Sequence, residues 1–275
     1  MNVLPLVLYA AAGVAYAVHF ARRKPHIGRL ATTLLILAAL THTFVIGMQT
    51  MEVRHVPFAN PSRAISTFVW LLALSYLYLE ITTDERAMGA FIMPMLVGLQ
   101  SIPAIWPGVE RMDPVLDSPW FWVHVSSLLV AYASLGLAGV LGLTYVVQFK
   151  EIKKKHLGYL YTRLPSLQTL DVMNSRAVTI GWIFLTIGVA VGAFWTGQAR
   201  AIAPDDPNLQ AMSLNDPKIL MAVLTWGVYS FGMFARRTMG WSGRRAAWLS
   251  AFGFAIVLLN FVPVSYFFTT SHTFR

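Results

Sequence analysis

"WFWVHVSSLLVAYASLGLAGVLGLTYVVQ", residues 120–148, runs for 29 residues without a single Asp, Glu, Lys or Arg. An α-helix rises about 1.5 Å per residue, and about 20 apolar residues are enough to cross the hydrocarbon core of a bilayer. A strand of a membrane barrel would instead alternate polar and apolar residues over about ten positions. The stretch therefore predicts a transmembrane α-helix.

The composition of the whole chain extends this prediction. The 275 residues are 56% hydrophobic and only 12% charged, with a mean hydropathy of +0.59, whereas soluble proteins carry about 25% charged residues. We therefore predict a single all-α domain over residues 1–275, a polytopic membrane helical bundle of about eight transmembrane helices. The predicted spans are 3–21, 30–49, 64–80, 87–106, 120–148, 176–196, 218–235 and 246–270.

The distribution of basic residues predicts the orientation of the bundle. Fifteen of the 21 Lys and Arg residues follow the first, third, fifth or seventh span. Cytoplasmic loops are enriched in Lys and Arg, so both termini are expected outside. The first span lacks a basic leader and a cleavage site, and we interpret it as retained. We expect a multi-pass protein of the cell inner (cytoplasmic) membrane, surrounded by lipid. The net charge of +9 orients the chain and requires no nucleic-acid partner.

The longest predicted inner segment is 150–175, in which Leu and Tyr recur at roughly helical spacing beside a basic cluster. Such a pattern is typical of an amphipathic segment on the cytoplasmic leaflet. An alternative is a solvated linker whose lysines stop membrane transfer. The apolar side chains expected to face the membrane or a soluble cytoplasmic partner are Leu157, Tyr159, Leu160, Leu164 and Leu167.

Two sets of glycines predict close helix packing. Gly188 and Gly192 stand four residues apart, and Gly136, Gly139 and Gly142 recur on one helical face. Small residues at such spacings let membrane helices approach each other closely. We interpret both sets as packing positions without a chemical role.

The chain offers few groups that could do chemistry. It has no cysteine, which excludes a thioether to heme, a disulfide relay and a zinc–thiolate site. Carboxylates are almost absent from the predicted spans, with Glu80 at an inner end. Ion carriers usually need acids within the membrane, so this class is disfavoured. Histidine is the ligand-type residue that recurs at membrane depth.

Three histidines stand out by position. His124 begins the fifth span near its outer mouth, His272 follows the eighth span toward the same face, and His42 lies near mid-membrane. Two imidazoles at one level on different helices can supply both axial nitrogens of a heme iron. Aromatic residues, including Trp120 and Trp122, surround the outer pair, but aromatics also form ordinary interfacial belts. The residues alone leave a heme site and ordinary interfacial histidines as alternatives.

Several segments resemble the cytochrome c assembly family of inner-membrane proteins, which includes synthetase subunits of the CcsA and ResC type, HemX and YpjD-type proteins. The resemblance covers nearly the whole chain. The segments are "FWVHVSSLLVAYASLG" at 121–136, "LPSLQTLD" at 164–171, "NDPKILMAVLTWGVYS" at 215–230, "GWSGRRAAWLSAFGFAIVLLNF" at 240–261 and "SHTF" at 271–274.

The resemblance implies a specific outer site. In the synthetase branch an external tryptophan-rich loop presents heme between two external histidines, and His124 and His272 match those axial ligands by position. Asp216 matches the end of the loop motif. The tryptophans expected before it are missing from "AMSLNDPK", and Trp195 lies further upstream. Phe234 stands where synthetases usually carry a histidine for an inner heme site. The resemblance therefore implies that the outer site is retained, while the tryptophan-rich loop and the inner site are degraded.

The implied function is the handling or delivery of heme at the outer face in c-type cytochrome biogenesis. The cofactor would be heme b, held without a covalent bond, with His42, Trp120 and Trp122 as further contacts. The partner would be a membrane protein or apocytochrome, and whether the chain belongs to a heme-attachment enzyme stays open. An alternative is a HemX-like regulator or scaffold, without heme ligation, that acts on a soluble partner through segment 150–175. An ion-transport accessory is a third alternative.

Overall fold

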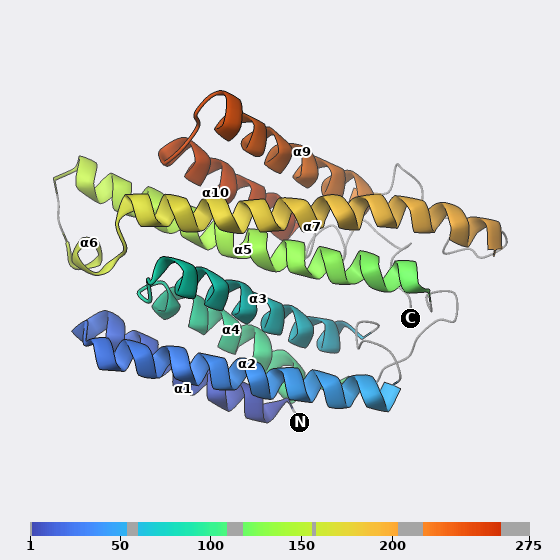
Figure 1. The fold of residues 1–275 in the computed structure, drawn as a ribbon, viewed down its shortest axis with the longest axis horizontal. Helices are drawn as coiled ribbons and strands as arrows, with labels where there is room; N and C mark the ends of the chain where they lie inside the picture. Colours follow the sequence, from blue (N-terminus) through green and yellow to red (C-terminus); the bar gives the residue numbers. More distant parts are fainter. Residues whose placement is uncertain (1, 54–59, 109–117, 156–157, 203–216, 260–275) are drawn as a thin grey trace.

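The computed structural model describes residues 2–53, 60–108, 118–155, 158–202 and 217–259. Within these ranges every regular element is helical (Figure 1), which confirms the predicted all-α class. The helices are α1 (Val3–Arg22), α2 (Pro25–Val53), α3 (Pro61–Thr83), α4 (Gly89–Ile105), α5 (Pro119–Lys153), α6 (Tyr159–Arg163), α7 (Leu167–Ile202), α9 (Pro217–Thr238) and α10 (Arg244–Leu259).

Six of the described helices, α1, α2, α3, α5, α7 and α9, are long and apolar enough to cross a membrane. The predicted fourth and eighth spans correspond to shorter helices. α4 is apolar but has 17 residues, with Pro94 and Pro103 inside it, and α10 has 16 described residues. The chain is a polytopic helical membrane bundle.

The helices form two groups (Figure 1). α1, α2, α3 and α4 pack together, and α5, α7, α9 and α10 form the second group. α3 joins the groups, because it contacts both α5 and α7. The largest cluster of buried apolar side chains crosses this junction, with fully buried members such as Leu72 on α3 and Leu137 on α5.

Tight turns connect the helices at one end of the bundle. Arg23 after α1 and Asp84 after α3 adopt left-handed backbone conformations, and their N–H groups bond to the carbonyls of His19 and Glu80. The α1–α2, α3–α4, α5–α7 and α9–α10 connections all lie at this end (Figure 1). The excess of Lys and Arg lies in or near these connections, and we call this end of the bundle its inner end.

The inner segment is shorter than predicted. α5 continues to Lys153 and α7 begins at Leu167, so much of 150–175 belongs to these two helices. The prediction that these side chains face the membrane or a partner is wrong for Leu164, which is buried, whereas Leu167 is partly buried and packs against the main core. The connection between α5 and α7 places these two side chains against the core, where they bury apolar surface.

Of the other three residues in that prediction, the structure describes the side chain of Tyr159 alone. The Tyr159 side chain is exposed, and its ring centroid lies 6.2 Å from that of Phe20 on α1. Leu157 and the Leu160 side chain lie outside the described residues.

Gly136, Gly139 and Gly142 all face α10, which confirms their predicted packing role. A Cβ built on Gly142 would lie 2.6 Å from the Ala247 carbonyl oxygen, and one on Gly139 would meet Phe254. The missing side chains let α5 and α10 approach closely.

Candidate functional site

Glycines on α7 let it approach α5 closely at three positions. A Cβ built on Gly188 would lie 2.7 Å from Leu128 Cδ2, and one on Gly181 would lie 2.5 Å from Leu135 Cδ2. The two helices run antiparallel, so residue numbers rise along α7 while those of the contacting residues fall along α5. From the inner to the outer end the pairs are Gly181 with Leu135, Gly188 with Leu128, and Gly192 with His124.

His124 lies at the outer end of this contact and is partly buried. Its Nδ1 is 2.7 Å from the Gly188 carbonyl oxygen. The Nδ1–Cε1 edge of the ring faces Gly192, where an added Cβ would overlap both atoms. No described residue forms a hydrogen bond with Nε2. The imidazole is therefore anchored to α7 by one nitrogen.

Aromatic side chains cluster on the first turn of α5 and the outer turns of α7. The ring centroids of Trp120 and Phe194 are 5.0 Å apart. Phe121 contacts both Trp122 and Trp195, with 5.4 Å between centroids in each case. Trp195 is buried, whereas 44% of Trp120 is exposed. Aromatic rings thus gather on the turns of α5 and α7 next to His124 and Gly192.

The structure places the predicted site residues unevenly. His124, Trp120 and Trp122 lie together on the first turns of α5. His272 and Asp216 lie outside the described residues. His42 is on α2 in the other helix group.

His42 is fully buried and engaged at both ring nitrogens. Nδ1 is 3.1 Å from the Tyr9 hydroxyl and Nε2 is 2.9 Å from Ser66 Oγ. Gln100 Nε2 lies 3.4 Å from the same Ser66 oxygen. The histidine thus belongs to a polar network inside α1–α4, and its contact with heme stays a prediction.

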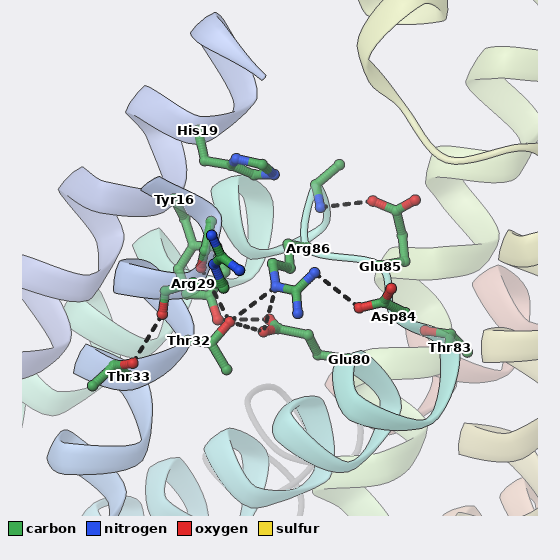
Figure 2. Close-up of polar contacts among 12 residues, drawn as sticks. Tyr16, His19, Arg29, Thr32, Thr33, Glu80, Thr83, Asp84, Glu85 and Arg86 are labelled. Carbon is green, nitrogen blue, oxygen red and sulfur yellow. Dashed lines mark hydrogen bonds and ion pairs between the residues drawn. The ribbon is translucent and has the colours of Figure 1, made fainter. Parts of the chain in front are cut away.

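A second polar cluster closes the inner end of the first helix group (Figure 2). Glu80 on α3 is only 1% exposed. Its carboxylate accepts hydrogen bonds from Tyr16 on α1, at 2.6 Å, and from Thr32 on α2. Arg86 Nε lies 3.9 Å from Glu80 Oε1, and Arg86 Nη1 lies 2.9 Å from Asp84 Oδ1. The carboxylate is fully partnered, so the cluster joins three helices and offers no open ligand position.

A comparable contact fastens the inner end of the second group. Arg236 on α9 donates two hydrogen bonds to Asp171 on α7, at 2.7 and 3.1 Å, and the Gly243 N–H donates a third, at 2.9 Å. Asp171 ends the segment "LPSLQTLD". This clamp ties the α9–α10 turn to the start of α7.

Sequence reasoning missed the roles of several groups at these sites. It placed Glu80 at an inner end without predicting burial, and it treated Gly188 and Gly192 as packing alone. The available signal was the match in spacing: the glycines lie one helical turn apart, and His124 lies one turn from Leu128. Only the antiparallel register brings these positions together.

The donor set of the outer site suits one kind of metal group. Among the described residues, no three His, Cys, Asp or Glu side chains are arranged to hold a metal ion. A heme iron takes four nitrogens from its macrocycle and requires only axial ligands from the protein. His124, with aromatic rings on the neighbouring turns, fits that requirement.

The chain is similar to known proteins over nearly its whole length. A family model described as "Cytochrome C assembly protein" matches residues 2–272. "Cytochrome c biogenesis protein CcsA" of Guillardia theta is 29% identical over 259 residues, covering 87% of this chain and 83% of the relative. The protein of the same description from Synechococcus elongatus is 26% identical over 308 residues, covering 95% of this chain and 90% of the relative.

Proposed function

The chain belongs to the Cytochrome C assembly protein family, and from this membership we propose that it acts in c-type cytochrome biogenesis by holding heme at the outer face of the membrane. The observation that carries the proposal is the His124 imidazole. One of its nitrogens is anchored on α7, and aromatic rings pack together on the neighbouring turns of α5 and α7. That arrangement would let His124 bind a heme iron while apolar rings nearby contact the macrocycle.

The remaining ligands follow from the resemblance. His272 would supply the second axial imidazole, with Asp216, Trp120 and Trp122 as further contacts and His42 as a deeper one. Two imidazoles would fill both axial positions of a heme iron and leave none for oxygen. Such a site is suited to holding heme and handing it over. Without a cysteine, the chain would hold heme b non-covalently.

The proposed setting is the cell inner (cytoplasmic) membrane, with heme on the outer side. The partner would be apocytochrome or a membrane protein that presents it, because the thiols that form thioethers to heme must come from another chain. The regulator alternative loses its main support, since Leu164 of the inner segment is buried and Leu167 packs against the core.

Absorption spectra of the detergent-purified protein, oxidised and then reduced, test the proposal. The wild type should carry heme with a six-coordinate, low-spin spectrum. His124→Ala should give a weaker high-spin spectrum or lose heme, because an axial ligand is gone. His19→Ala is the matched control, since that histidine bonds to the Lys24 carbonyl at the inner end and should leave the spectrum unchanged. A wild type that never carries heme when heme is supplied, or a His124→Ala variant with the wild-type spectrum, would falsify the proposal.

A further inference from the structure

We propose that Gly188 and Gly192 of α7 are positioning residues for His124. The Gly188 carbonyl fixes which ring nitrogen carries the hydrogen, and Gly192 leaves the space that the ring occupies. The inference rests on the proposed function, because it concerns how His124 meets a heme iron.

The first step is the tautomer. A backbone carbonyl can only accept a hydrogen bond, so His124 Nδ1, 2.7 Å from the Gly188 oxygen, must carry the hydrogen. In a neutral imidazole the other nitrogen, Nε2, then holds a lone pair. Metal-bound histidines usually donate their second N–H to a carbonyl or carboxylate, which orients the ring and raises its basicity. The Gly188 carbonyl thus prepares Nε2 as the ligand atom.

The second step is the space for the ring. A Cβ on Gly192 would overlap Nδ1 and Cε1 of His124. Any side chain at position 192 must therefore push the imidazole away from α7 and out of reach of the Gly188 carbonyl. The two glycines act on the same edge of one ring, one by hydrogen bonding and the other by shape.

The third step separates this role from helix packing. Gly181 serves the same α5–α7 contact, and its added Cβ would meet Leu135 and the Ala131 carbonyl. It lies three helical turns from Gly192, on the inner side, and does not touch His124. Gly181→Ala is therefore the matched control for any general loosening of the two helices.

The experiment compares Gly192→Ala with Gly181→Ala in the full chain, purified with heme. Gly192→Ala should lose low-spin heme and retain heme about 10-fold less tightly, the usual loss when a group that orients a metal ligand is disturbed. Added free imidazole should restore the low-spin spectrum by taking the place of the displaced ring. Gly181→Ala should keep the wild-type spectrum and show only a lower thermal stability.

The outcomes separate the two proposals. If the wild type holds no heme, or His124→Ala changes nothing, the heme function itself fails. If heme depends on His124 but Gly192→Ala keeps the wild-type spectrum, the positioning inference alone is overturned. An equal spectral loss in Gly181→Ala also overturns it, since the effect would then be one of packing.

A second variant decides the matter if Gly192→Ala does not accumulate. His124→Gly removes the ring that an alanine at position 192 would strike. The double variant His124→Gly/Gly192→Ala should then accumulate to the level of His124→Gly alone. Failure to recover would show that the clash lies elsewhere and would refute the inference.

Discussion

Glu80 shows how a carboxylate is held inside a membrane helix bundle. It is 1% exposed, and its oxygens accept from Tyr16 and Thr32 while Arg86 lies beside it. An isolated charge in an apolar environment is costly, and the cluster offsets that cost with hydrogen bonds and a partly hydrated guanidinium. The charge network thus fastens α1 and α2 to the end of α3.

We expect Glu80→Gln to lower the free energy of unfolding by about 1–3 kcal/mol, the usual cost of a buried polar group left unsatisfied. The amide keeps one acceptor oxygen, so either Tyr16 or Thr32 loses its bond to this side chain, although Thr32 can still donate to the Gly28 carbonyl at 3.1 Å. The loss should stay moderate because the Arg86 side chain is 29% exposed and also pairs with Asp84. Unfolding of the detergent-purified variant by sodium dodecyl sulfate measures the change.

Asp84→Asn is the control for this prediction. The Asp84 side chain is 84% exposed, and exposed ion pairs contribute about 0–1 kcal/mol. Stability close to wild type is expected. Equal losses in the two variants would mean that burial of Glu80 is not what gives the cluster its strength.

Single residues also mark where sequence reasoning reached its limit. His124 stood out because a lone imidazole among tryptophans at a span mouth is unusual in its local sequence. The burial of Glu80 could not be predicted from its local sequence, because its partners Thr32 and Tyr16 are 48 and 64 residues away along the chain. The spacing of Gly188 and Gly192 indicated a close contact, but not that an imidazole is the contacting group.

At the scale of helices, the glycine face of α5 gives a second prediction. We expect Gly142→Ala to destabilise the protein by about 1–3 kcal/mol, the usual range for overpacking. Its Cβ would meet the Ala247 carbonyl, a backbone atom that cannot rotate aside, so α10 must shift as a whole. The apparent Tm in detergent reports the loss.

Gly98→Ala in α4 provides the comparison. A Cβ at that position meets nothing within 4 Å, and alanine favours a helix over glycine by up to about 1 kcal/mol. The Tm should stay level or rise. A Gly142→Ala variant as stable as Gly98→Ala would contradict the close α5–α10 contact.

Helix existence could be predicted from the sequence, whereas helix ends could not. Long apolar runs indicated each span, because a run of about 20 apolar residues is long enough to cross a bilayer and cannot all face water. The ends were missed because helices continue past the hydrocarbon core into polar residues that also favour helix. α5 therefore extends to Lys153, and α7 begins at Leu167 rather than near the predicted start of its span at 176.

For the whole molecule, the charge distribution predicts which side faces the cytoplasm. Fifteen of 21 Lys and Arg residues lie in or near one set of connections, and these connections lie together at one end of the bundle (Figure 1). A phosphatase fused at the C-terminus should be active outside, and a fluorescent protein inserted after Lys154 should fluoresce inside. A phosphatase inserted after Gly108 is the control for the outer side. A cytoplasmic C-terminus would reverse the orientation and place His124 on the wrong face.

Because the helices form two groups, the protein should tolerate being made as two separate polypeptides. Membrane helices insert before they pack, and the groups meet through α3 against α5 and α7, so the covalent link between α4 and α5 is not what holds them together. Two separate polypeptides, broken between Gly108 and Ser118, should reassemble when co-expressed and copurify through a tag on one of them. The lysines at the end of α5 would orient the second fragment on their own. Fission of the gene at this point should therefore be tolerated, whereas a break between α5 and α7 would divide the group that holds His124.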